Sequence, residues 1–183
     1  KEILKILSDA GTLIAKKVGG NISVNMGKIT TFWKKIPLSE DMDPLNIPIR
    51  VEGFDNGVGV NIGNPHIVFF GKSIENIDLN VIGSKIENHK FFPNKTNVEF
   101  IEIINSNKIK MKVWERGVGE TLACGSGACA ATVACHALGL IDDEVEIELP
   151  GGVATATWSG QGSLFLSGPA ATVYEGKINI DDI

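Results

Sequence analysis

Short segments in which apolar and polar residues alternate run through most of this chain. Residues 21–26 (Asn-Ile-Ser-Val-Asn-Met) show the two-residue period of a half-buried strand. Similar alternation, or a short apolar run between turn residues, predicts the strands 2–7, 12–18, 21–26, 49–54, 57–62, 66–71, 97–104, 108–115, 144–149, 153–158, 163–167 and 172–176. Residues 34–48 contain three prolines and predict a surface loop. The pattern is that of a chain built mainly from short strands.

Two segments show a helical pattern. Leu79, Ile82 and Ile86 recur at helical spacing and predict a short helix over residues 78–88. Residues 126–138 predict a second helix with almost no polar face, ended by Gly139, and a helix that is apolar all round must be buried all round. Many strands and one buried helix predict an α+β fold, in which a curved, barrel-like mixed sheet wraps around the central helix.

Composition narrows the class of protein. At 183 residues the chain allows one domain, or one and a fraction. A net charge of −5 with scattered lysines argues against a nucleic-acid surface. The apolar stretch 122–140 is rich in Ala and Gly and contains His136, so it predicts a core helix rather than a membrane span. Three cysteines without a regular framework, and no secretory pattern, favour a reduced cytoplasmic setting.

The residue that points to chemistry is Cys124, which comes just before Gly125-Ser126-Gly127 and the apolar helix. The start of a helix offers unpaired N–H groups and about half a positive charge, which favour a thiolate and can hold a carboxylate. On these residues alone, a buried inert thiol after a simple glycine turn stays open. Cys129 and Cys135 lie within the predicted helix and are expected to be core residues. The cysteines form no Cys-x-x-Cys and the histidines are far apart, which argues against a zinc site.

The segment 115–130 (Glu-Arg-Gly-Val-Gly-Glu-Thr-Leu-Ala-Cys-Gly-Ser-Gly-Ala-Cys-Ala) resembles the second-cysteine motif of diaminopimelate epimerases. Asn64-Pro65-His66, Thr96-Asn97 and the Glu-Leu-Pro-Gly-Gly run at 148–152 follow in the order of that family. The likeness covers nearly the whole chain and corresponds to the C-terminal two-thirds of such an enzyme. It implies two pseudo-symmetric halves, each a curved sheet around a central helix, with the active site between them.

The resemblance also implies an activity, the interconversion of LL- and meso-diaminopimelate in lysine and peptidoglycan-precursor biosynthesis without metal or other cofactor. One cysteine takes the α-proton from one face while a second returns a proton to the other. The catalytic residues implied are Cys124, Glu115 and His66, and the substrate-binding residues are Asn64, Asn97, Glu115, Arg116, Gly125 and Ser126. Without the motif, His66 reads as a turn histidine and Glu115 as an exposed strand end.

One departure from the family pattern bears on the division of the chain. The family's first cysteine lies in a Cys-Gly-Asn-Gly segment, which this sequence does not contain, and the chain opens at Lys1 without a methionine. We therefore expect half of a two-base site, inactive alone, whose partner is the missing N-terminal half of the same protein. Residues 1–26 are then a remnant of that half, 27–170 the half with Cys124, and 171–183 a return to the first half. A homodimer is compatible with this division, whereas nucleic acid and membrane are not expected as partners.

Three alternatives remain. Residues 125–130 also fit the dinucleotide pattern G-x-G-x-x-A, although no buried strand is predicted directly before them. A proline-racemase-like enzyme would use the same paired-cysteine chemistry, but its cysteine segment lacks the lead-in at 115–121. A catalytically silent fragment would keep the fold and the carboxylate site without turnover.

Overall fold

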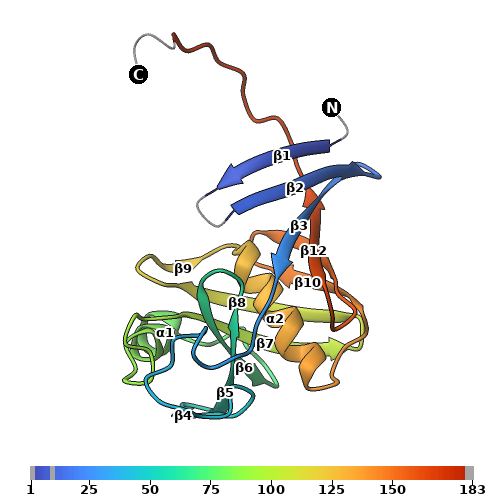
Figure 1. Ribbon diagram of the computed structural model, residues 1–183. Helices are drawn as coiled ribbons and strands as arrows, with labels where there is room; N and C mark the ends of the chain where they lie inside the picture. Colours follow the sequence, from blue (N-terminus) through green and yellow to red (C-terminus); the bar gives the residue numbers. More distant parts are fainter. Residues whose placement is uncertain (1–2, 9–10, 180–183) are drawn as a thin grey trace.

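A computed structural model describes residues 3–8 and 11–179, which form twelve strands and two helices (Figure 1). The elements are β1 (Ile3–Ser8), β2 (Gly11–Val18), β3 (Asn21–Lys28), β4 (Ile47–Val51), β5 (Phe54–Asn61), β6 (Pro65–Gly71), α1 (Leu79–Glu87), β7 (Asn97–Asn105), β8 (Lys108–Glu115), β9 (Gly119–Thr121), α2 (Gly125–Ala137), β10 (Glu144–Leu149), β11 (Gly152–Thr157) and β12 (Ser163–Pro169).

The strands form one mixed sheet in the order β1-β2-β3-β12-β11-β10-β8-β7-β6-β5-β4, with β9 paired to β8. The pairs β6–β7 and β8–β10 are parallel, and the other pairs are antiparallel. Helix α2 contacts strands from both parts of this order, β5 to β8 and β11 to β12, so the sheet curls around it (Figure 1). The predicted α+β fold with a curved sheet around a central helix is confirmed.

Helix α2 is buried through its whole middle part. Every side chain from residue 127 to residue 135 is buried, as expected from a helix without a polar face. At its end the Leu140 N–H donates to the Cys135 carbonyl and the Gly139 N–H to the His136 carbonyl, both at 2.9 Å. This double closure needs a left-handed residue, which Gly139 supplies with φ +68°. The predicted helix over 126–138 is therefore confirmed to within one residue at each end.

Helix α1 belongs to a second core beside the first. Asp78 caps it by accepting from the N–H groups of Asn80 and Val81, and its apolar face joins a cluster around Phe69 and Phe100. Gly83 of α1 lies so close to Trp114 of β8 that an added Cβ would be 2.7 Å from the indole Cγ. Helix α1 is thereby packed against the end of β8, the strand that leads into the segment 116–124 before Cys124.

Two predicted segments differ from the structure. Residues 34–48 lack long regular structure, but Ile36, Leu38 and Ile47 are buried, so the prediction of a surface loop was wrong for these side chains. An added Cβ at Gly59 would be 2.8 Å from Ile47 and 3.1 Å from Ile36, which shows that the segment covers β5.

The predicted strand 172–176 is also wrong, because residues 170–179 form no strand and run exposed beyond β12 (Figure 1). Val173 and Tyr174 are 90% and 86% exposed, so the apolar pattern there has no sheet to bury it within the described chain. The first residue of the predicted strand 2–7 lies outside the described residues. Within the described ranges, no helix has the length and apolar character needed to span a membrane.

Candidate functional site

The predicted site residues gather at one edge of the sheet. In the parallel pair β6–β7, His66 lies opposite Asn97, and both strands start at this edge. In the antiparallel pair β7–β8, Val98 lies opposite Trp114, so β8 ends where β7 begins and delivers Glu115 to the same place. Three sequence-distant segments of the predicted site are therefore neighbours because of the strand order alone.

Asn97 joins two of these segments through its amide. Its Nδ2–H donates to the Pro65 carbonyl at 2.8 Å, and its Oδ1 accepts from the Arg116 N–H at 2.9 Å. The Arg116 side chain is exposed and donates to the Asn94 carbonyl at 3.3 Å. The structure thus brings Asn97 and Arg116 together. The Asn97 side chain also links β6 to the turn after β8 through these two hydrogen bonds.

Strand β9 brings the chain from Glu115 back toward Cys124. The Thr121 hydroxyl donates to Glu115 Oε1 at 2.6 Å, which fixes the carboxylate on the β8–β9 hairpin. Gly151 then supports the loop before the cysteine, since its N–H donates to the Leu122 carbonyl at 2.7 Å. An added Cβ at Gly151 would be 3.0 Å from that same oxygen, which explains why a glycine stands in the Pro-Gly-Gly turn.

Cys124 is the N-cap of α2. The Gly127 N–H donates to its Sγ at 3.4 Å, and the Ser126 Oγ lies 3.5 Å from the sulfur. The side chain is nearly buried, with 7% of the residue exposed. The N–H groups of Gly125 and Ser126 belong to the first turn, where a helix has no internal acceptor for them. The predicted position of Cys124 at the start of the buried helix is confirmed.

The protonation of Cys124 differs from the expectation. Burial raises the pKa of the Cys124 thiol to about 11, because the hydrogen bonds from Ser126 and Gly127 do not offset the loss of solvent, and the negative charge of Glu115 acts in the same direction as burial. The Gly127 N–H at the helix start lowers the pKa of Cys124, in the direction predicted from the sequence, but burial outweighs it and the net shift is upward.

His66 is fully buried, with its two ring nitrogens in contact with different side chains. Its Nδ1 lies 2.7 Å from Glu99 Oε1, and its Nε2 lies 2.9 Å from Asn64 Oδ1. His66 lies within strand β6, so its interpretation as a turn histidine is wrong. Glu99 was missed in the sequence, although an acid inside the apolar run Val98 to Ile101 of a buried strand was the signal for it.

A second buried acid, Glu87 at the end of α1, was also missed. It accepts from Trp114 Nε1 at 2.8 Å and from the Gly117 N–H at 2.9 Å, and Lys95 lies 3.5 Å away. Burial raises the pKa of the Glu87 carboxyl, but these donors and the Lys95 charge outweigh burial and hold the pKa below its usual range. Glu87 therefore anchors the turn that carries Glu115 and Arg116.

Comparisons of the sequence with known proteins identify the family of this chain. A family profile described as diaminopimelate epimerase matches residues 58–173, a span that includes every site residue above. The chain belongs to the diaminopimelate epimerase family. It is 40% identical over 177 residues to a diaminopimelate epimerase of Acidiphilium cryptum and 39% identical over 186 residues to one of Pelagibacter ubique. It is also 46% identical over 154 residues to that of a Wolbachia endosymbiont of Brugia malayi.

These matches cover nearly all of this chain but a smaller share of each relative. They include 96%, 98% and 83% of this chain but only 64%, 67% and 59% of the respective relatives. The chain thus spans about two thirds of the length of the epimerases that it matches most fully. The expected resemblance to the diaminopimelate epimerase family is confirmed, and the matched share is close to the expected two thirds.

Solved structures support the fold alone. A PhzF-family phenazine biosynthesis protein of Enterococcus faecalis matches with a TM-score of 0.64 at 13% identity, over 98% of this chain and 66% of that chain. A hydroxyproline epimerase of Agrobacterium vitis, solved with trans-4-hydroxy-L-proline, matches with a TM-score of 0.59 at 14% identity, over 91% and 56%. These two proteins therefore share the fold of this chain.

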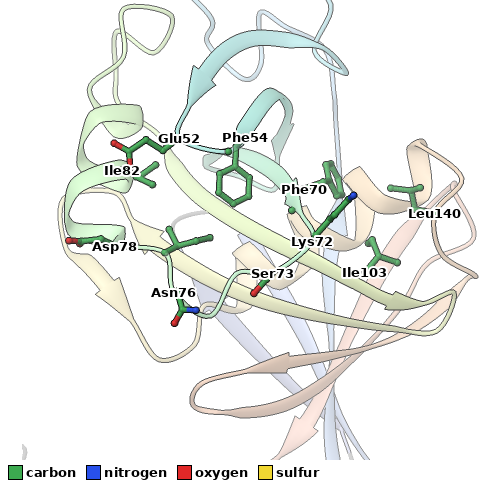
Figure 2. A pocket seen from close by; sticks show the side chains of 13 residues that line it. Glu52, Phe54, Phe70, Lys72, Ser73, Asn76, Asp78, Ile82, Ile103 and Leu140 are labelled. Carbon is green, nitrogen blue, oxygen red and sulfur yellow. The ribbon is translucent and has the colours of Figure 1, made fainter.

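Two other features do not belong to the site. A groove of about 1000 Å³ lies where β6 and β7 end, at the opposite ends of these strands from His66 and Asn97, and Figure 2 shows Phe70, Lys72 and Ile103 along it. The dinucleotide pattern at 125–130 lies inside α2, and a loop rather than a buried strand comes directly before it. The strand–glycine turn that such a fingerprint requires is therefore not present there.

Proposed function

We propose that this chain is the Cys124-bearing portion of a cofactor-independent epimerase that interconverts LL- and meso-diaminopimelate. The observation that carries the proposal is the position of Cys124, which caps a buried helix beside Glu115 and next to two first-turn N–H groups. Proton transfer at an amino-acid α-carbon needs an acid or base and a group that holds the carboxylate. The Cys124 thiol and the first-turn N–H groups of α2 supply the two within one helical turn. Because the chain spans about two thirds of its relatives, this activity belongs to a protein that also supplies the remaining third.

In the proposed reaction Cys124 acts as the acid in one direction. A thiolate on the opposite side of the substrate takes the α-proton, and the Cys124 S–H gives its proton to the other face of the α-carbon. The configuration inverts, and the two sulfurs have exchanged their protonation states. The Gly125 and Ser126 N–H groups hold the reacting carboxylate and stabilise the charge that moves onto it in the transition state. The Gly127 N–H, already directed at Sγ, stabilises the Cys124 thiolate that results.

The high pKa of Cys124 supports this assignment rather than opposing it. A thiol with a pKa of about 11 is present almost entirely as the acid at neutral pH, so it is ready to donate. Substrate binding brings an ammonium group into the site, and a positive charge favours the thiolate when the reaction runs in reverse. We assign to Glu115 the binding of that ammonium and to His66 a supporting part in proton transfer.

The distal end of diaminopimelate is assigned to the β6–β7–β8 edge. The exposed Arg116 guanidinium has the planar fork that suits a carboxylate, and within the described ranges it makes a single hydrogen bond, to the Asn94 carbonyl. Asn64 contributes its amide, and Asn97 keeps the two segments at a fixed separation through the hydrogen bonds of its side-chain amide to the Pro65 carbonyl and the Arg116 N–H. A substrate with a second amino-acid group, rather than a simple amino acid, is the ligand that makes use of this edge.

The opposing base is assigned to the part of the protein outside this chain. Cys129 and Cys135 are fully buried within α2, so neither can face Cys124 across a substrate. Leu7 of β1 and Val173 are 85% and 90% exposed, as expected of surfaces that pack against further protein. We propose accordingly that residues 1–26 and 171–183 belong to the half that carries the opposing base, and 27–170 to the half with Cys124.

The test is an epimerisation assay with and without the remaining third. LL-diaminopimelate is incubated with the chain alone, and with a protein in which the missing family segment precedes it, without added metal or cofactor. Only the longer protein should form meso-diaminopimelate, and Cys124→Ala should abolish the activity while Cys135→Ala retains it. Proline serves as the substrate control. Epimerisation by the chain alone, or by the longer protein with Cys124→Ala, would contradict the two-base assignment, and inactivity of the longer wild-type protein would favour a silent fragment.

A further inference from the structure

Glu99 lies deeper in the protein than the residues assigned to substrate, on the face of β7 that meets α2. Its side chain is fully buried. An added Cβ at Gly127 would be 2.9 Å from Glu99 Oε1 and 3.4 Å from Cys124 Sγ, so the carboxyl group lies against the first turn of α2, directly beside the cysteine. Burial of a carboxyl group in this place costs free energy unless it forms hydrogen bonds, because the sheet core around it is apolar.

The contacts of His66 limit its protonation to two arrangements, and both place a hydrogen on Nε2. The Asn64 Oδ1 that faces His66 Nε2 at 2.9 Å is a carbonyl oxygen and can only accept, so Nε2 carries a hydrogen. In a neutral imidazole the other nitrogen is then an acceptor. Glu99 Oε1 lies 2.7 Å from that nitrogen, Nδ1, so the hydrogen bond joins either a neutral ring to a protonated Glu99 or an imidazolium to a Glu99 carboxylate. The second arrangement buries two charges, and the first buries none, which favours the protonated acid.

The charges around Glu99 point to the same protonation state. Its second oxygen, Oε2, is buried and has no hydrogen-bond partner in the described part of the chain. The ionisable groups that face the carboxyl are His66, Glu115 and Cys124, and none of these is a lysine or an arginine. An ionised carboxylate with one oxygen unpaired would be more costly there than a neutral acid in the same place. Burial also raises the pKa of Glu99.

We propose that Glu99 is a positioning residue, a neutral carboxylic acid that donates its proton to Nδ1 of His66 and thereby sets the orientation of Asn64. With Nδ1 occupied as an acceptor, His66 presents Nε2–H to Asn64 Oδ1. The Asn64 amide then has its Nδ2 hydrogens left for a ligand, so this position selects an acceptor such as a carboxylate. The neutral state also keeps a negative charge away from Cys124 when its thiolate forms and when a carboxylate binds at the start of α2.

The protonation state can be measured on this chain itself, without any activity. The protein is labelled with ¹³C at the glutamate carboxyls and ¹⁵N in the histidine rings, and Glu99→Gln assigns the Glu99 signal. At pH 7 Glu99 should give the chemical shift of a carboxylic acid, and His66 the shifts of a neutral ring with hydrogen on Nε2. Glu75, exposed and paired with Lys110, is the internal carboxylate reference. A carboxylate signal from Glu99, with an imidazolium or an Nδ1–H ring, would overturn the proposal.

The consequence for turnover rests on the proposed function and is tested in the longer protein. Glu99→Gln keeps an N–H donor toward Nδ1 and should retain kcat within about threefold, whereas Glu99→Leu removes the donor and should lower kcat by about tenfold or more. Glu75→Gln is the matched control and should leave kcat unchanged. A loss with Gln as large as with Leu would overturn the proposal. An inactive wild-type protein would refute the proposed function but not the protonation state.

Discussion

Cys124 should react slowly with alkylating agents near neutral pH and much faster in base. Only the thiolate reacts. With a pKa of about 11, about 0.1% of Cys124 is thiolate at pH 8, against about 10% for a cysteine at the ordinary value of 9.0. The rate of modification should therefore rise about tenfold for each pH unit between 7 and 10.

The other two cysteines give the comparison within the same molecule. Burial raises the pKa of Cys129 and of Cys135 to about 12, so at pH 8 the thiolate fraction of each is about a tenth of that of Cys124. Both are also fully buried, whereas Cys124 is 7% exposed. Cys124 should thus be labelled at least about ten times faster than either.

The assay is brief iodoacetamide treatment over a pH series, followed by peptide mass mapping. A Cys124→Ser variant reports the background from Cys129 and Cys135. A rate for Cys124 that levels off below pH 9 would show a low-pKa thiolate and refute the argument from burial. Equal labelling of the three cysteines would refute the placement of Cys124 at the open end of α2.

Two further predictions concern the packing that holds the site. Glu87→Gln replaces one acceptor oxygen with a donor in front of Trp114 and Gly117, and should lower the free energy of unfolding by about 1–3 kcal/mol in urea melts at pH 7, with Glu75→Gln near zero. The pKa of Glu87 is lower in the folded than in the unfolded protein, so its ionised carboxylate stabilises the fold fully above pH 4.5, and this stabilisation is lost as the pH falls through the folded-state pKa. A difference in unfolding free energy between wild type and Glu87→Gln that persists undiminished at pH 2 would contradict this prediction. Gly83→Ala places a Cβ 2.7 Å from the indole and should cost about 1–3 kcal/mol, and a stability equal to wild type would show that α1 can shift away.

The sequence predicted those elements correctly whose hydrophobic pattern fits only one type of secondary structure. Residues 126–138 have no polar face and can only be a buried helix, and the alternation in 97–104 and 108–115 gave the hairpin that the structure contains. The segment 172–176 failed because alternation predicts a strand only where a neighbouring strand is available. Its apolar residues are exposed in the described chain, and the pattern could not show that.

The candidate site was predicted in part for a similar reason. Motif residues such as Asn64, Glu115 and Cys124 are named by sequence, and the strand order brings them together. Glu99 and Glu87 act through contacts to residues far away in the chain, His66 and Trp114, which a linear pattern cannot reveal. The pKa of Cys124 was misjudged because the helix start was visible in the sequence, whereas the depth of burial around it was not.

The central claim, that Cys124 exchanges a proton with the α-carbon of diaminopimelate, is tested most directly by solvent-deuterium incorporation. The longer protein is incubated with each stereoisomer in D₂O, and deuterium at the α-carbon is measured by mass spectrometry for wild type and Cys124→Ala. Wild type should place deuterium in the epimerised product formed from either isomer, and Cys124→Ala should form no deuterated epimer. Deuterated epimer from the Cys124→Ala protein at the wild-type rate would show that the proton comes from another group and would contradict the account.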